Sequence, residues 1–107
     1  MLLFKEIKED EVLDDDLERL SKKLGGKWKA LTKRLGFDQD DVDVFDINEN
    51  KVEDKSYRML CTWKRREASS ATFKVLYEAL CHVGRNDLAE KYCIRKPTEK
   101  EASKSEG

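Results

Sequence analysis

The sequence has little of what several functional classes require. It contains one proline and one histidine, and its formal net charge is only −1. No apolar run approaches the roughly 20 residues of a transmembrane helix, and charged residues follow Met1-Leu2-Leu3-Phe4 at once, unlike the pattern of a signal peptide. We therefore expect no membrane span, no secretory leader and no general attraction to nucleic acid.

The three cysteines and the histidine show no pattern of a catalytic or metal site. Cys61, Cys81 and Cys93 lie far apart in the sequence, whereas zinc ligands come in closely spaced pairs. His82 follows Cys81 directly, but neighbouring residues on a helix do not face each other, so they make a poor nucleophile–base pair. We expect free thiols in a reducing cytoplasm, with no catalytic residue, no metal and no cofactor.

What the sequence has in abundance is charge. Charged residues make up 42% of the chain and apolar residues 38%, so the chain can fold only if its apolar side chains gather on narrow faces. The charges alternate in blocks along the chain. Residues 9–18 are mainly acidic, residues 19–34 basic, residues 38–49 acidic, and residues 64–66 basic.

Apolar residues recur at intervals of three and four, which is the spacing of amphipathic helices. A first helix ends at Gly25-Gly26, a short second helix ends at Gly36, and Asp38 is placed to cap a third. The apolar stripes of these helices are Leu13, Leu17, Leu20 and Leu24; Trp28, Leu31 and Leu35; and Val42, Phe45 and Ile47.

The second half of the chain continues the helical pattern. A fourth helix is predicted from about Asp54 to Glu67, followed by a loop and cap at Ala68-Ser69-Ser70. The fifth carries the broadest apolar face and ends at Gly84, and Asn86 is placed to cap a sixth. These two helices present Phe73, Leu76, Tyr77, Leu80 and Val83, and then Leu88, Ala89 and Tyr92.

One segment challenges the helical prediction. Val42 to Ile47 reads VDVFDI, in which apolar and acidic residues alternate as in a half-buried strand. The capping aspartate before it and the many acids around it, which are poor strand formers, favour a helix. The sequence therefore predicts an all-α bundle of six helices. We divide the chain into an extension or linker (1–12), one helical domain (13–93) and a disordered tail (94–107).

The ordered set of helices resembles the death domain over about residues 13 to 93. The residues that carry the resemblance are Trp28-Lys29-Ala30-Leu31 and Leu35-Gly36 in the second helix, Trp63 near the end of the fourth, Ala71-Thr72 with Leu76, Ala79 and Leu80, and Asn86-Asp87-Leu88-Ala89-Glu90. The resemblance implies an antiparallel Greek-key bundle of six helices without catalysis, whose members bind one another in signalling complexes of cell death or innate immunity.

One motif departs from this pattern. Arg85-Asn86-Asp87-Leu88 also fits the R-x-D-L signature in the last helix of the related death effector domain. That signature works there with an acidic residue on the second helix, and the second helix of this chain is basic. The two tryptophans and the Ala71-Thr72 step favour the death domain.

The basic segment from Arg19 to Arg34 allows two interpretations. Trp28 could stack a nucleic-acid base between lysines, but its register with Leu31 and Leu35 favours a core position. The first interpretation would make the chain a small nucleic-acid-binding domain, and we keep this as the alternative function. We favour a protein surface, because basic and acidic patches on one small domain suit head-to-tail contacts between copies.

The resemblance places partner contacts on the first four helices and on the loops after the third, fourth and fifth helices. Sequence alone does not identify the partner, the kind of parent protein or the number of copies. Reversing the charges of Asp40 and Asp41 together is expected to abolish partner capture and leave the fold intact. The predicted partner-binding residues are Arg19, Lys22, Lys23, Lys33, Arg34, Asp40, Asp41, Asp43, Lys64, Arg65, Arg66, Arg85 and Asp87.

Overall fold

The computed structural model describes residues 7–8 and 10–94, and this part of the chain is helical apart from turns and two isolated β-bridges. The predicted all-α bundle of six helices is confirmed. Two short 3₁₀ turns, Gly25–Lys27 and Ala68–Ser70, join helices. The helices are α1 (Asp14–Leu24), α2 (Trp28–Arg34), α3 (Gln39–Asn48), α4 (Val52–Glu67), α5 (Phe73–His82) and α6 (Asn86–Cys93).

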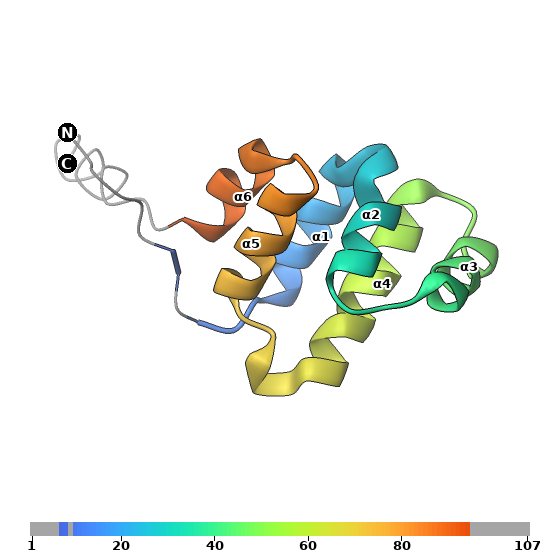
Figure 1. Ribbon diagram of the computed structural model, residues 1–107, viewed down its shortest axis with the longest axis horizontal. Coiled ribbons are helices and arrows are strands. Elements are labelled where there is room, and N and C mark those ends of the chain that lie inside the picture. The colour runs from blue at the N-terminus through green and yellow to red at the C-terminus, as the bar shows by residue number, and fades with distance from the viewer. Residues whose placement is uncertain (1–6, 9, 95–107) are drawn as a thin grey trace, which may run out of the picture.

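The helices pack in two groups. α1 lies mainly along α4, and α5 lies along α6, while α2 touches both α4 and α5. Figure 1 shows α5 and α6 at one end of the molecule and α3 at the other. α3 packs mainly on α2 and α4. Only two of its residues, Val42 and Phe45, are buried.

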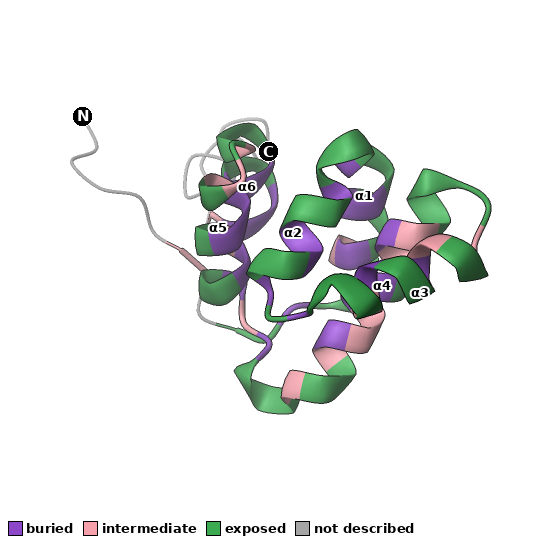
Figure 2. Cartoon of the chain, turned by 45° about the vertical axis from the view of Figure 1, so that its right-hand side comes forward, coloured by how far each residue is buried: buried purple, intermediate pink, exposed green. Residues whose placement is uncertain are grey.

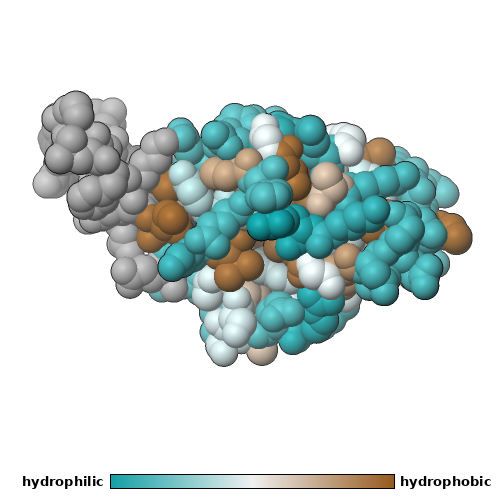
Figure 3. Space-filling model, in the orientation of Figure 1, coloured by the Kyte–Doolittle hydropathy of each residue, from teal (hydrophilic) through white to brown (hydrophobic). Residues whose placement is uncertain are grey.

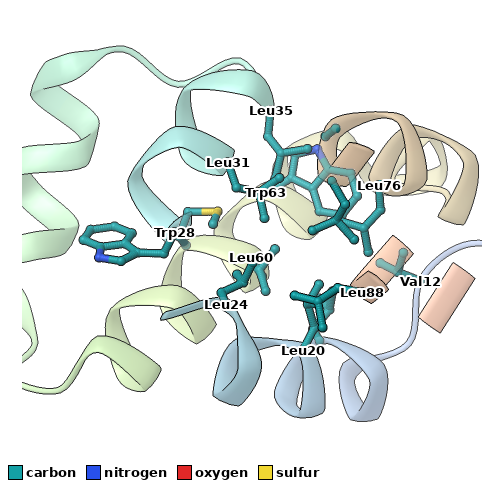
Figure 4. Packing of buried hydrophobic residues seen from close by; sticks show 14 of the residues in the cluster. Val12, Leu20, Leu24, Trp28, Leu31, Leu35, Leu60, Trp63, Leu76 and Leu88 are labelled. Carbon is teal, nitrogen blue, oxygen red and sulfur yellow. The ribbon is translucent and has the colours of Figure 1, made fainter. Parts of the chain in front are cut away.

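A single apolar cluster holds the bundle together. Trp28 and Trp63 are 3% and 1% exposed, and both belong to this cluster. Figure 4 shows the two indoles with Leu31 and Leu60, which come from α2 and α4. The predicted core position of Trp28 is confirmed, so its ring is not available to stack on a base.

Local sequence explains how most of the helices begin and end. At the start of α3, Asp38 and Asp41 form a reciprocal capping box. Gly25 takes the positive φ of 56° that closes α1, a conformation with little steric cost for glycine. The side chain of Thr72 accepts a hydrogen bond from the amide of Val75 and thereby caps α5.

Some expected boundaries were wrong. α4 begins at Val52, two residues early, because the acids Glu53 and Asp54 occupy its first turn, where the helix dipole favours them. α6 begins at Asn86 itself and has no side-chain cap. Ala68–Ser70 forms a 3₁₀ turn and leaves the capping of α5 to Thr72.

Two residues expected on apolar stripes are exposed. Leu13 precedes α1 and is 60% exposed, and Ile47 is 80% exposed. Ile47 lies about 200° around α3 from Phe45, because each helical residue turns by about 100°. It therefore points away from the side of α3 that packs on α4.

The two ends of the described chain meet beside α5 and α6. Ile7 forms a β-bridge with Ile94, and Glu11 forms another with Thr72. Val12 donates its amide to the carbonyl of Ala71 at 2.9 Å and is 1% exposed. The described residues of the expected N-terminal segment (7–8 and 10–12) thus have a β-like rather than a helical backbone. Val12, the last of them, contributes to the core. The expected disordered tail lies, beyond Ile94, outside the described residues.

Candidate partner-binding surface

The outer side of α3 combines exposed acids with exposed apolar side chains. Asp40 and Asp43 are exposed, and Val44 and Ile47 are 53% and 80% exposed. Residues three and four apart lie on the same side of a helix, so these four form one surface. We call it the acidic–apolar face (Asp40, Asp43, Val44, Ile47). Sequence reasoning found its acids but missed its apolar residues.

Asp41 is part of the fold rather than of this face. Its carboxylate accepts a hydrogen bond from the amide of Asp38 at 3.0 Å, and its own amide donates to the Asp38 carboxylate at 2.9 Å. Losing such a cap costs about 0.5–2 kcal/mol. The joint charge reversal of Asp40 and Asp41 would therefore weaken α3 itself. Asp40 and Asp43 make the better pair, because Asp43 contacts only the Gln39 amide, at 2.9 Å.

Ion pairs fix the opposite side of α3 to its neighbours. The carboxylate of Asp46 binds the ammonium of Lys55 on α4 and lies 3.5 Å from that of Lys29 on α2. Glu49, just after α3, pairs with Arg58 on α4 at 2.6 Å. These contacts set the orientation that leaves the acidic–apolar face toward solvent. The hydrogen bond from Lys55 lowers the pKa of Asp46 against the opposing effect of partial burial, and Lys29 adds to the lowering.

Replacing Asp46 with asparagine should remove a pH-dependent part of the stability. Because the folded pKa lies below the ordinary 3.8, ionised Asp46 stabilises the fold fully above its unfolded pKa. This contribution is lost as the pH falls through the lower, folded pKa. The difference in melting temperature between the wild type and Asp46→Asn should be largest at neutral pH and shrink in strong acid. Thermal melts over that range test this; an equal difference throughout would contradict it.

The basic residues predicted on α1 are exposed. Arg19 and Lys23 have no ion-pair partner among the residues that the structure describes, and Lys22 lies 3.9 Å from Glu18 in the preceding turn. We call these three the α1 basic row (Arg19, Lys22, Lys23). Lys33 and Arg34, at the end of α2, are exposed as well. Figure 3 shows that hydrophilic side chains cover most of the face that carries α2 and α3.

Arg66 and Lys64, at the end of α4, contact their own domain. Lys64 pairs with Asp14 of α1 at 2.9 Å. The guanidinium of Arg66 donates to the carbonyl of Leu35 at 2.9 Å and lies 4.2 Å from the centre of the Phe37 ring. Both side chains thus contact other parts of the domain, whereas Arg65 between them has no hydrogen bond or ion pair with the described residues.

Arg85 and Asp87 form a second internal contact. Arg85 donates to the carbonyls of Lys23 and Leu24 at 3.2 Å each, at the carboxyl end of α1. It also donates to both carboxylate oxygens of Asp87, at 3.0 and 3.1 Å, and this lowers the pKa of Asp87. The arginine of the R-x-D-L motif therefore binds a helix end and its neighbouring acid, not an acid on α2.

The described residues present no arrangement of catalytic groups or metal ligands. Residues 7–8 and 10–94 hold no group of three or more His, Cys, Asp or Glu that could bind a metal ion. The three cysteines are free thiols, and burial raises the pKa of Cys93 to about 12, which makes a thiolate scarce. Tyr57 and Cys61 lie in an open groove of about 680 Å³ between α1 and α4.

None of the helices in the described part of the chain is long and apolar enough to cross a membrane. The basic segment that favoured nucleic acid is divided between α1 and α2, and the tryptophan within it is buried. The described residues leave exposed charged faces, and on α3 two exposed apolar side chains, Val44 and Ile47, lie beside the acids. Apolar side chains bordered by polar residues are typical of protein-binding surfaces.

Comparison with known proteins agrees with this interpretation. The family model described as Death domain matches residues 14–92. The chain is 35% identical over 78 residues to human receptor-interacting serine/threonine-protein kinase 1. This match covers 70% of this chain and 12% of the kinase. It is 32% identical over 63 residues to rat death domain-containing membrane protein NRADD. This match covers 59% of this chain and 26% of that protein. The chain thus spans a minor part of both relatives.

Proposed function

This chain belongs to the death-domain family of protein-interaction modules, and we propose that it acts by binding other death domains, including copies of itself. Association of this kind would assemble signalling complexes in cell-death or innate-immune pathways. The proposed location is the cytoplasm, and the domain would serve an adaptor, a kinase or a receptor. It would need no cofactor and carry out no catalysis of its own.

The acidic–apolar face is the observation that supports this proposal. Single exposed apolar side chains are common on soluble domains, but neighbouring ones that form a patch bordered by polar residues mark an interaction site. At protein interfaces a few well-packed side chains supply most of the affinity, and the surrounding charges select the partner and speed the encounter. Val44 and Ile47 suit the first role, and Asp40 and Asp43 suit the second.

The α1 basic row is the complementary surface on the next copy. α1 packs on α4 and α6, whereas α3 packs on α2 and α4, so the two surfaces belong to different parts of the molecule. When two copies bind through these unlike surfaces, one copy still has an unoccupied acidic–apolar face and the other an unoccupied α1 basic row. It therefore extends to rings or helical assemblies rather than stopping at a twofold dimer.

Replacing Ile47 with serine should weaken self-association about 10- to 100-fold. Burying an isoleucine side chain contributes about 1.5–3 kcal/mol, and about 1.4 kcal/mol is a factor of ten in affinity. The melting temperature should hardly change, because Ile47 is 80% exposed and exposed substitutions shift stability by less than about 0.5 kcal/mol. Sedimentation equilibrium gives the dissociation constant.

Val75→Ser is the matched control, because Val75 on α5 is 40% exposed and far from α3 in the chain. It should associate like the wild type. If the two variants weaken association equally, the apolar residues of α3 are not the contact. If the wild type stays monomeric and captures no death domain at any concentration, the chain is a docking element within a larger protein instead.

A further inference from the structure

The turn between α4 and α5 projects from the body of the domain. Trp63 is the last buried residue of α4 and Ala71 is the next buried residue, so none of residues 64–70 contributes to the core. Figure 1 shows this turn as the corner below α4, and Figure 2 shows most of it exposed. Ala68 has a positive φ of 53°, a conformation that residues with a Cβ rarely adopt.

The corner carries the most accessible hydroxyl groups that the structure describes. Ser69 and Ser70 are exposed, and no hydrogen bond of either hydroxyl to the described residues is present. Every other described serine and threonine is at least half-buried. These are Ser21, Thr32 and Ser56, which are buried, Thr62, which bonds the carbonyl of Arg58, and Thr72, which caps α5.

The charge before Ser69 matches one class of enzyme. Arg66, Arg65 and Lys64 stand three, four and five residues before Ser69. Protein kinases select substrates partly by charge, and an acidic substrate cleft favours arginine three residues before the acceptor. Ser70 has no basic residue at that distance. We propose that Ser69 is a phosphorylation site for a protein kinase that recognises Arg-x-x-Ser.

The corner can reach a kinase cleft at modest cost. A cleft binds its substrate in an extended form, so the last turn of α4 after Trp63 must open. This breaks the contacts of Arg66 with Leu35 and Phe37 and the ion pair of Lys64 with Asp14, but it exposes no buried apolar side chain of α4. It also releases the strained backbone of Ala68. Local openings of this kind require much less free energy than global unfolding.

The transfer itself is balanced by the kinase and its ATP. The Ser69 oxygen forms a bond to the γ-phosphorus, the bond from that phosphorus to the β-phosphate oxygen breaks, and ADP leaves. The hydroxyl proton passes to the catalytic aspartate of the kinase. The product carries about −1.5 to −2 charges at neutral pH. It would cancel half or more of the positive charge of Lys64, Arg65 and Arg66. The assignment of Ser69 as a phosphorylation site does not depend on how the domain associates.

A phosphorylation assay on the folded domain tests the proposal. The purified protein is incubated with Mg-ATP and a kinase of Arg-x-x-Ser specificity, and the site is mapped by peptide mass spectrometry. We expect one phosphate on Ser69, retained in Ser70→Ala and lost in Ser69→Ala. Phosphate on Ser70 alone, or none on the folded domain while a peptide of residues 62–74 accepts it, would overturn the proposal.

The role of Arg66 is tested separately by the rate. Recognition by an ion pair predicts that Arg66→Ala slows phosphorylation about tenfold, whereas Arg34→Ala, which removes an exposed arginine elsewhere, leaves the rate unchanged. If Arg66 acted only as a tie to Leu35 and Phe37, its loss would loosen the corner and speed phosphorylation. A faster rate in Arg66→Ala would therefore contradict the proposal that the kinase recognises Arg66.

Discussion

Trp63→Ala should lower the free energy of unfolding by about 3–5 kcal/mol. The indole is 1% exposed and is the largest fully buried side chain among the described residues. Alanine would leave a cavity in the cluster that joins α4 to the other helices. Because small domains have only about 5–15 kcal/mol of stability, this loss would remove a large fraction of it.

Urea unfolding followed by circular dichroism and by the fluorescence of the remaining Trp28 measures this effect. Val75→Ala, at an exposed position on α5, is the control and should change stability by less than about 0.5 kcal/mol. A loss below about 1 kcal/mol in Trp63→Ala would show that the indole is not packed as described.

Reversing charge on the acidic–apolar face should weaken self-association by at least about tenfold. In Asp40→Lys/Asp43→Lys the altered face would meet the α1 basic row of the next copy, and like charges across an interface cost several kcal/mol. The reciprocal variant, Arg19→Glu/Lys23→Glu, should fail in the same way. Both should remain folded, because Asp40, Arg19 and Lys23 have no ion-pair partner among the described residues.

A mixture of the two variants separates a real contact from general damage. The lysines of one variant can meet the glutamates of the other, so the mixture should associate although neither variant does so alone. Added salt should weaken this association, because exposed charges are screened over about 8 Å at physiological ionic strength. No recovery in the mixture would mean that these two surfaces do not touch.

Periodicity was sufficient to predict the helices, because each one must bury a narrow stripe in a chain this charged. The prediction was wrong where a stripe was extended by one residue. Leu13 fits the spacing of α1 but precedes it, and Ile47 follows Phe45 too closely to share its side of α3. Spacing describes a helix that has already formed, and its ends depend on local hydrogen bonds.

The sequence did not show which charged residues contact their own domain and which remain free. Arg66 and Arg65 are neighbours of the same kind, but Arg66 stacks on Phe37 and Arg65 makes no such contact with the described residues. Asp41 and Asp40 differ in the same way, because only Asp41 closes the capping box. These differences arise from helices brought together by packing. The partner-binding residues therefore remain predictions, narrowed by the structure to the side chains that it leaves free.

The same packing explains why the apolar part of the candidate surface was missed. Val44 lies within an alternating acidic and apolar segment, and the predicted stripe correctly included Val42 and Phe45 but wrongly added Ile47. The ion pairs of Asp46 and Glu49 fix the orientation of α3. Once it is fixed, Val44 and Ile47 lie outward beside the acids.

Chemical-shift mapping of self-association tests the central claim most directly. Unlabelled domain is titrated into ¹⁵N-labelled domain, and the backbone amides that shift are assigned. Two separate groups should shift, one on α3 around Val44 and Ile47 and one on α1 around Arg19 and Lys23. Association that shifts amides elsewhere while both groups stay unchanged would contradict the claim that α3 of one copy binds α1 of the next.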